Sequence, residues 1–468
     1  MRAGFGREIF FRPLTSMWTR FIQAGKRLLD AFTGWLHKRE YDAGLISSVQ
    51  RWLPYVGGAV LVAGLAVLYE KLFEWAEHFL ILVKTHADWL FFGLTPVMFL
   101  LGWVMVRRYA PAAGGSGIPQ LMVAIDARKG QKRVSTGDLL GGRVLLTKLG
   151  SSVAALLGGA LIGREGPTIQ MSAAIFYVIH KLLPASWPRI ERPRMLIAGG
   201  AAGLAAAFNT PLGGIVFVIE ELTRAHLNTF KSSLLYAVIF AGMTVQWLLG
   251  PYLYLGYPKV AADGLDTLLW VVLFSAVAGI AGAYKSKLIL AILAWKRRRV
   301  RGWGQVWFVL ACGLAVGAII FFNDDVAYGP GKEIMNRYLF NQHRAPATLS
   351  LLLSRFFGAI LSYSSGVAGG VFATSLTTGS LVGELLMNLL DLPAENKLFI
   401  LSAMIGFLTG VTRSPFTSSI LVLEMTDRHS AIFHFMLAGL VASVAARLVD
   451  RRSLYGELAK AYLQPEPA

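Results

Sequence analysis

The sequence predicts an all-α polytopic membrane protein built from two repeats of inverted topology. Composition is the first reason: 55% of the 468 residues are hydrophobic, 15% are charged, and the mean hydropathy is +0.55. Uncharged apolar stretches, near the ~20 residues that a bilayer-spanning helix needs, also recur along the chain. Broken hydrophobic segments then repeat at one fixed offset. Together these features exclude a soluble globular domain.

The chain opens with a basic arm, residues 1–51, which lacks the short apolar core of a cleavable signal. Its interleaved basic and aromatic residues fit either an amphipathic helix on the inner leaflet or a solvated or dimer-contacting helix. Residues 52–250 and 251–460 are the expected transmembrane repeats, and residues 461–468 are a short cytoplasmic tail. Spans are expected at 52–69, 89–106, 232–258, 267–284, 302–323 and 430–446.

Basic clusters between the expected spans contribute to the net charge of +18. They lie at 107–108, 128–133, 296–301 and 451–452. The positive-inside rule assigns these clusters to the cytoplasm, which explains the charge better than a nucleic-acid partner does. Both termini then face the cytoplasm beneath the cell inner (plasma) membrane, and the acidic loop at 70–88 lies outside.

Four hydrophobic segments are too short or too interrupted to be simple spans: 166–179, 195–219, 398–412 and 414–423. Pro211 and Glu220 have the same spacing as Pro415 and Glu424, an offset of 204 (211 to 415, and 220 to 424). Backbone that is not helical inside a membrane must be buried in protein or line a wet cavity. Paired broken helices therefore predict a shared site near the midplane.

Three glycine-rich breaks are suited to binding an anion: residues 114–119, 163–167 and 366–374. Each is a candidate helix start, where free amide donors and the positive end of the helix dipole hold an anion without a localised cation. Ser116 adds a hydroxyl donor. One break alone is better explained as a helix cap or a close helix contact, but the three together favour a site.

Glu165 is a carboxylate at the expected depth of the membrane, where an unpaired charge is costly and indicates function. Its expected place is the anion's own site, because a carboxylate can occupy the same amide cradle and leave it when protonated. A salt bridge to Arg164 is the structural alternative, although adjacent helical residues point in different directions.

The runs 115–119 (GSGIP), 163–167 (GREGP) and 369–373 (GGVFA) resemble the three signature motifs of the CLC chloride channel and transporter family. The resemblance extends over residues 52–460. It implies supporting roles for the motif residues Gly115, Gly117, Pro119, Gly163, Arg164, Gly166, Pro167, Gly369 and Gly370.

The resemblance also implies how the anion is held. The hydroxyls of Ser116 and Tyr455 and the backbone amides of Val371 and Phe372 would coordinate a central chloride. Glu165 would be the external gating glutamate. By its position alone, Tyr455 would instead be an aromatic residue of the membrane interface.

Glu221 matches the internal glutamate that carries protons in the family's exchangers. Two ionisable groups on opposite sides of an anion site can relay a proton while the anion moves the other way. If Glu221 only ends a helix, the chain is a passive chloride channel. We expect an exchanger of chloride and protons, surrounded by lipid and, by the resemblance, assembled as a homodimer.

Two positions depart from the family pattern. Thr374 stands where the third motif usually ends in proline, and Ala368 stands where bacterial members commonly have another proline; both affect loop rigidity more than the anion donors. Ser116 argues for chloride, because proline at this position accompanies nitrate preference and a methionine-bearing motif accompanies fluoride export. Since 13 residues follow Tyr455, we expect no appended cytoplasmic regulatory domain.

A membrane-embedded enzyme and a receptor or scaffold are the competing classes. An enzyme needs a nucleophile with its base or a metal cluster, yet the eight histidines have no metal-binding spacing and Cys312 is the one cysteine. A receptor would need a signalling domain outside the membrane. We therefore expect no enzymatic activity, metal or cofactor. Lys148 is expected to screen the site or to pair with a buried carboxylate.

Overall fold

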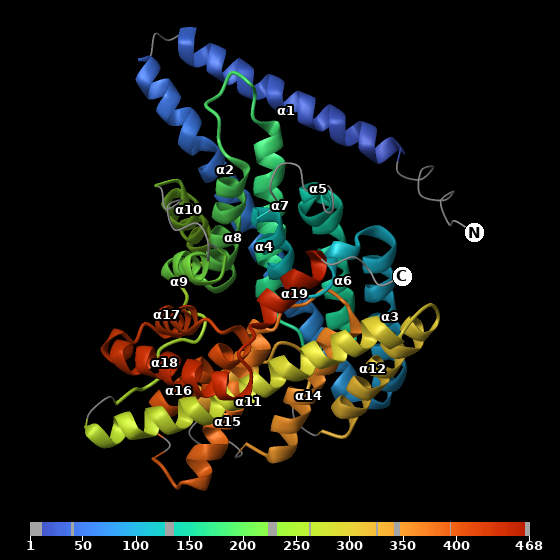
Figure 1. Ribbon diagram of the computed structural model, residues 1–468, viewed down its shortest axis with the longest axis vertical. Helices are drawn as coiled ribbons and strands as arrows, with labels where there is room; N and C mark the ends of the chain where they lie inside the picture. Colours follow the sequence, from blue (N-terminus) through green and yellow to red (C-terminus); the bar gives the residue numbers. More distant parts are fainter. Residues whose placement is uncertain are drawn as a thin grey trace.

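The computed structural model describes residues 12–38, 42–126, 135–222, 232–261, 264–323, 326–340, 347–393 and 395–463. These residues form helices and connecting loops, with no β-strand among them (Figure 1). The basic cluster at 128–133 lies outside the described residues.

The first half of the chain begins with a surface helix and continues into packed helices of unequal length. Its elements are α1 (Arg12–Lys38), α2 (Ala43–His86), η1 (Asp88–Leu90), α3 (Phe91–Tyr109), η2 (Pro111–Ala113), α4 (Ile118–Asp126), α5 (Thr136–Leu140), α6 (Gly142–Leu157), α7 (Glu165–Leu182), α8 (Arg192–Phe208), α9 (Pro211–Phe217), the π-helical turn η3 (Val218–Leu222) and α10 (Ser232–Leu249).

The second half repeats this mixture of long and short helices. Its elements are α11 (Leu265–Arg299), α12 (Gly304–Phe321), α13 (Lys332–Phe340), α14 (Leu349–Ser365), α15 (Phe372–Leu389), α16 (Leu398–Thr412), α17 (Pro415–Thr426), η5 (His429–Ala431), α18 (Ile432–Val449) and α19 (Leu454–Leu463).

Six helical stretches in the described part are long and apolar enough to cross a bilayer. They are Ala43–His86, Asp88–Tyr109, Thr136–Leu157, Leu265–Arg299, Gly304–Phe321 and His429–Val449. Four of them contain an expected span, Gly304–Phe321 lies within the span expected at 302–323, and Thr136–Leu157 was not anticipated. The expected span at 232–258 is too long, because α10 ends at Leu249. Gly250, with a φ of +81°, and the proline after it stop the helix there.

The acidic segment after the first span is helical, which corrects the expectation of a loop. Glu70, Glu74 and Glu77 lie within α2, a single helix of 44 residues. Pro54 stands inside that helix without ending it. The expected boundary between residues 51 and 52 therefore falls within α2, and the boundary at 461 falls within α19.

The two Pro-to-Glu segments confirm the internal repeat. Asn209 ends α8 and Arg413 ends α16, both in the left-handed conformation (φ 55° and 68°), and a proline starts the next helix in each case. The positions differ by the same offset, 209 to 413. Proline suits the first helical turn because its missing N–H would have no helical partner there.

Glu220 and Glu424 bind each other's helix start, as the inverted repeat requires. Glu220 accepts hydrogen bonds from the amides of Phe416 (3.2 Å) and Thr417 (2.7 Å) at the start of α17. Glu424 accepts from Leu212 (3.0 Å) and Gly213 (2.6 Å) at the start of α9. Carboxylates are favoured at this positive end of the helix dipole. The reciprocal bonds tie the two halves of the chain together.

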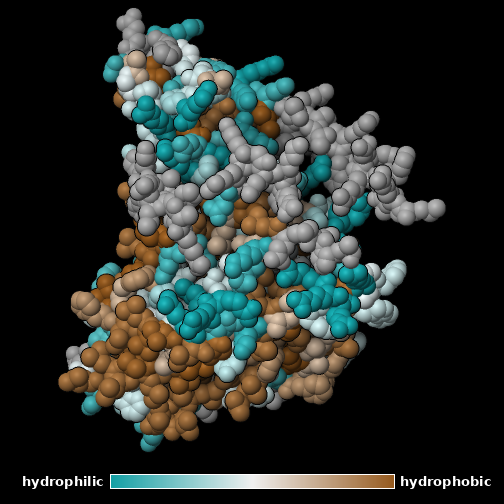
Figure 2. Space-filling view, in the orientation of Figure 1, coloured by the Kyte–Doolittle hydropathy of each residue, from teal (hydrophilic) through white to brown (hydrophobic). Residues whose placement is uncertain are grey.

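Hydrophobic side chains cover the surface over α11, α17 and α18, whereas hydrophilic ones gather at the end that carries α1 (Figure 2). Examples of exposed apolar side chains are Trp247, Leu265, Phe433 and Leu448. Exposing such a surface to water costs free energy, whereas lipid tails accommodate it. The chain is thus a multi-pass membrane protein.

Replacing Glu424 with alanine should destabilise the fold by about 1–3 kcal/mol, because it leaves two amide groups at the start of α9 without their acceptor. The measurement is thermal unfolding of the purified protein in detergent, where the midpoint should fall. Glu395→Ala is the control, since Glu395 is exposed. Equal midpoints for the two variants would contradict a stabilising role for the reciprocal bonds.

Candidate anion site and its two glutamates

The three glycine-rich breaks meet through their backbones, with the third break in the middle. Gly115 donates a hydrogen bond to the carbonyl of Val367 (2.9 Å) and accepts one from Gly369 (3.1 Å). Gly163 and Gly370 exchange two bonds, of 2.9 and 2.7 Å. Short bridges of this kind satisfy backbone groups that are buried and not helical.

Each break ends in a helix start, as predicted. α4 begins at Ile118, α7 at Glu165 and α15 at Phe372, which is preceded by Val371 as the N-cap. The first amide groups of a helix have no partner within it, and the dipole places partial positive charge at that end. Helix starts therefore converge on one buried region.

Glycine is needed where the first two breaks pass each other. Gly117 has a φ of +97°, and a Cβ there would lie 2.5 Å from Cβ of Gln170. A Cβ on Gly166 would lie 2.8 Å from the Ser116 Oγ. The absence of side chains at these positions lets the Ser116 hydroxyl reach the start of α7.

Ser116, Phe372 and Tyr455 lie together although they are far apart in the sequence. All three are buried. The rings of Phe372 and Tyr455 stack with centroids 6.3 Å apart, and the Tyr455 hydroxyl lies close to Ser116. That hydroxyl makes no hydrogen bond of normal geometry among the described residues, with Ser116 as its neighbour. A buried polar atom without a partner is uncommon and is consistent with a ligand position.

Glu165 reaches from the start of α7 to the start of α15. One carboxylate oxygen lies 3.4 Å from the amide nitrogen of Ala373, and the other has no hydrogen-bond partner within the described part of the chain. Arg164 does not pair with it, because Arg164 donates to Glu70 at 2.8 Å. The carboxylate of Glu165 thus points at helix amides and remains loosely held.

Glu221 lies buried in the π-helical turn that follows α9. Its carboxylate accepts a hydrogen bond of 2.6 Å from Ser414, the residue before α17. π-helical turns occur often at functional sites because they re-aim one side chain of a helix.

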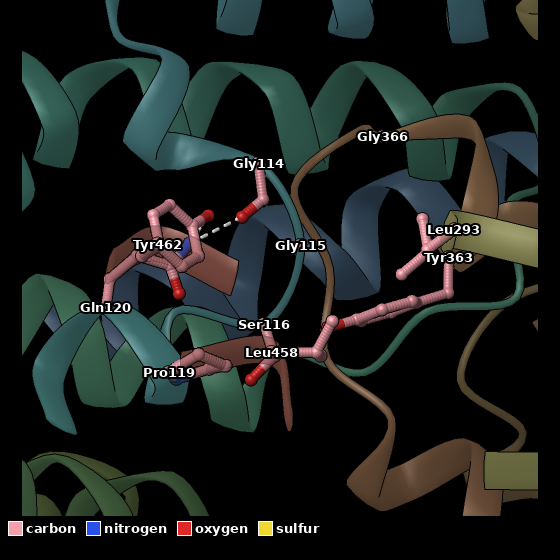
Figure 3. A pocket seen from close by; sticks show the side chains of 10 residues that line it. All are labelled: Gly114, Gly115, Ser116, Pro119, Gln120, Leu293, Tyr363, Gly366, Leu458 and Tyr462. Atoms are coloured by element: carbon pink, nitrogen blue, oxygen red, sulfur yellow. Dashed lines mark hydrogen bonds between the residues drawn. The ribbon is translucent and has the colours of Figure 1, made fainter. Parts of the chain in front are cut away.

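A cavity of about 200 Å³ reaches Ser116 from one direction (Figure 3). Its lining includes Pro119, Gln120 and Tyr462, and the Gln120 amide donates to the Tyr462 hydroxyl at 2.8 Å. Gly366, another lining residue, lies next to the Lys296 ammonium. Lys296, in the basic last turn of α11, therefore lies beside this cavity.

A second cavity, of about 40 Å³, reaches Glu165. Its charged lining residues are Glu70, Glu74, Glu77, Arg164 and Lys332. Ser116 and Glu165 thus face different cavities, and the helix starts lie between them. This is the arrangement expected of a permeation site with two separate entrances.

Lys148 is buried beside the site and donates to the carbonyl of Gly115 at 2.9 Å. It forms no ion pair among the described residues, so the expected pairing with a carboxylate is wrong, and a backbone acceptor takes that place. Sequence reasoning also missed Gln170, which donates to the carbonyls of Ala112 and Leu139. Its apolar neighbours gave no signal of this polar role.

Ser116→Ala should weaken chloride binding by roughly two- to tenfold, the worth of one hydrogen bond. Isothermal titration calorimetry on the purified protein measures this directly. Ser380→Ala is a matched control, because Ser380 is equally buried but bonds to Thr377 within α15. If both variants bind chloride like the natural chain, Ser116 is not a ligand.

Comparison with known proteins agrees with this geometry. A family model described as voltage gated chloride channel matches residues 97–447. The H(+)/Cl(-) exchange transporter ClcA of Vibrio cholerae serotype O1 (strain M66-2) is 30% identical over 425 residues, covering 86% of this chain and 88% of the relative. The protein of that name from Vibrio parahaemolyticus serotype O3:K6 (strain RIMD 2210633) is 28% identical over 430 residues, with the same coverage of 86% and 88%.

Solved structures show the same fold. A slow cyanobacterial Cl-/H+ antiporter matches with a TM-score of 0.76 and 23% identity, covering 88% of this chain and 98% of that one. A CLC-type fluoride/proton antiporter matches with a TM-score of 0.70 and 20% identity, covering 89% and 98%. On the extent of the family-model match and the identity to the ClcA relative, this chain belongs to the CLC family of voltage gated chloride channels and transporters.

Proposed function

We propose that the protein exchanges chloride for protons across the membrane. The observation that carries this proposal is the position of Glu165, whose carboxylate lies at the start of α15, where an anion would be held. Curated relatives at 30% and 28% identity are named H(+)/Cl(-) exchange transporters, which supports the same function.

The chemistry follows from competition for the helix amides. An ionised Glu165 is attracted to the positive end of α15 and excludes chloride from it. Protonation removes that charge, and the side chain leaves the amides to the anion. Proton uptake at Glu165 and anion entry are therefore linked at one place.

Glu221 is proposed as the internal proton glutamate. It is buried, and its carboxylate accepts a hydrogen bond from Ser414 at the junction of the two repeats. A proton that reaches Glu221 and then Glu165 would pass beside the anion ligands Ser116 and Tyr455. The alternative is a passive channel in which Glu221 only ends its helix.

Chloride is the proposed anion. Ser116 supplies a small hydroxyl donor, and the Tyr455 hydroxyl and the Val371 and Phe372 amides complete a ligand set without a localised cation. Similarity to a fluoride/proton antiporter at 20% identity concerns the fold alone.

The proposed orientation puts the Ser116 cavity on the cytoplasmic side and the Glu165 cavity outside. Arg107 and Arg108 end α3, and Lys296 to Arg299 end α11, which fits the positive-inside rule. We propose that both termini are cytoplasmic, that the membrane is the inner (plasma) membrane, and that the protein is a homodimer. We further propose that it has no enzymatic activity, since its named relatives are transporters.

The test is proton flux in proteoliposomes under an imposed chloride gradient. The natural chain should drive protons against their own gradient. Glu221→Gln should abolish proton movement while chloride still passes, and Glu165→Gln should abolish proton movement as well, because neither amide can carry a proton.

Glu395→Gln is the control, because Glu395 is exposed and away from both cavities. Chloride flux without protons in the natural chain would make the protein a channel. Unchanged proton coupling in Glu221→Gln would remove Glu221 from the pathway.

A further inference from the structure

A buried lysine lies beside the start of α15 and forms no ion pair within the described part of the chain. Lys285, on α11, is fully buried. Its ammonium lies 5.4 Å from the centre of the Phe407 ring. Its hydrogen bond within the described part of the chain goes to the Thr374 hydroxyl, at 3.4 Å. Burying an amine in such surroundings costs free energy, which indicates that Lys285 has a function.

Thr374 passes this contact on to the backbone. Its hydroxyl accepts from Lys285 and donates to the carbonyl of Val371 at 3.1 Å. Ser375 donates to the same carbonyl twice, from its hydroxyl at 2.6 Å and from its amide at 3.0 Å. The Val371 carbonyl is therefore strongly polarised.

The polarised carbonyl belongs to the same peptide group as the amide of Phe372. Resonance joins the C=O and N–H of one peptide unit. Donors on the carbonyl oxygen withdraw electron density and make the N–H a stronger donor, which is the basis of cooperative hydrogen bonding. The Phe372 N–H is one of the proposed chloride ligands.

We propose that Lys285, acting through Thr374, is a positioning residue that strengthens the Phe372 amide as a chloride donor. The inference rests on the proposed function and deepens it. Lys285 does not touch the anion; it acts on the peptide group that does. Proline at position 374, the usual residue of the family motif, has no hydroxyl with which to make this connection.

A purely structural role for Lys285 makes a different prediction. Replacing a buried charge that lacks an acidic partner with an apolar side chain of similar size is often neutral or stabilising. Lys285→Met should therefore keep the thermal midpoint of the natural chain while binding chloride less tightly. A chain of hydrogen bonds from Lys285 through Thr374 to the Val371 carbonyl, here called the relay, predicts a loss of chloride affinity without a loss of thermal stability.

The experiment is chloride titration calorimetry on detergent-purified protein, with thermal unfolding measured on the same samples. Lys285→Met and Thr374→Val should each weaken chloride binding by roughly three- to tenfold, the range of a hydrogen-bond effect. The double variant should bind chloride as tightly as the single variant of lower affinity, because both substitutions break the same relay. Lys287→Met is the matched control, since Lys287 is exposed two residues further along the helix.

Each of the following outcomes would overturn a stated part of the proposal. Unchanged affinity in Lys285→Met would overturn the inference and leave the proposed function standing, provided the natural chain binds chloride. Additive losses in the double variant would overturn the relay, because the two residues would then act independently. An equal loss in Lys287→Met would also overturn it, since any positive charge would serve. No chloride binding by the natural chain would overturn both proposals.

Discussion

The fold depends on hydrogen bonds between backbone segments that are not helical and lie inside the protein. Residues 367–370 pair with Gly115 on one side and with Gly163 on the other. Unpaired backbone is intolerable in an apolar interior, so these bonds hold the breaks together. Because a helix starts directly after each break, pairing the breaks also gathers three helix starts. The candidate anion site is thus a consequence of how the chain satisfies its own backbone.

The charged side chains around the candidate site take partners from elsewhere in the fold, and Glu165 is held only weakly. Arg164 pairs with Glu70, Lys148 donates to a carbonyl, and Glu220 and Glu424 accept from helix amides elsewhere in the fold. Glu165 has one long contact, of 3.4 Å, to a helix amide. In the proposed mechanism, this weakly held carboxylate exchanges with an anion at the same helix start. Lys285 contacts the same helix start through the Thr374 hydroxyl, at 3.4 Å.

Both halves of the repeat contribute residues to the surroundings of the candidate site. Glu220 and Glu424 cap each other's helices at matching positions, so the halves of the chain meet as related units of opposite direction. Glu221 and Ser414 bond across this junction. The neighbourhood of the internal glutamate is therefore built by both halves, and a change in how the halves pack would be felt at Glu221.

The sequence by itself determined the class of protein, the offset of the repeat and the places where helices break, because hydropathy, glycine and proline act locally. It also identified Glu165, since a charge in an apolar region is visible without a structure. Only the tertiary structure decided which partners the charges have. Arg164 bonds to Glu70 from a distant part of the chain, Lys148 takes a carbonyl, and Lys285 meets Thr374 across two helices. These contacts join residues that are far apart in the sequence, and local pattern carries no information about such pairs.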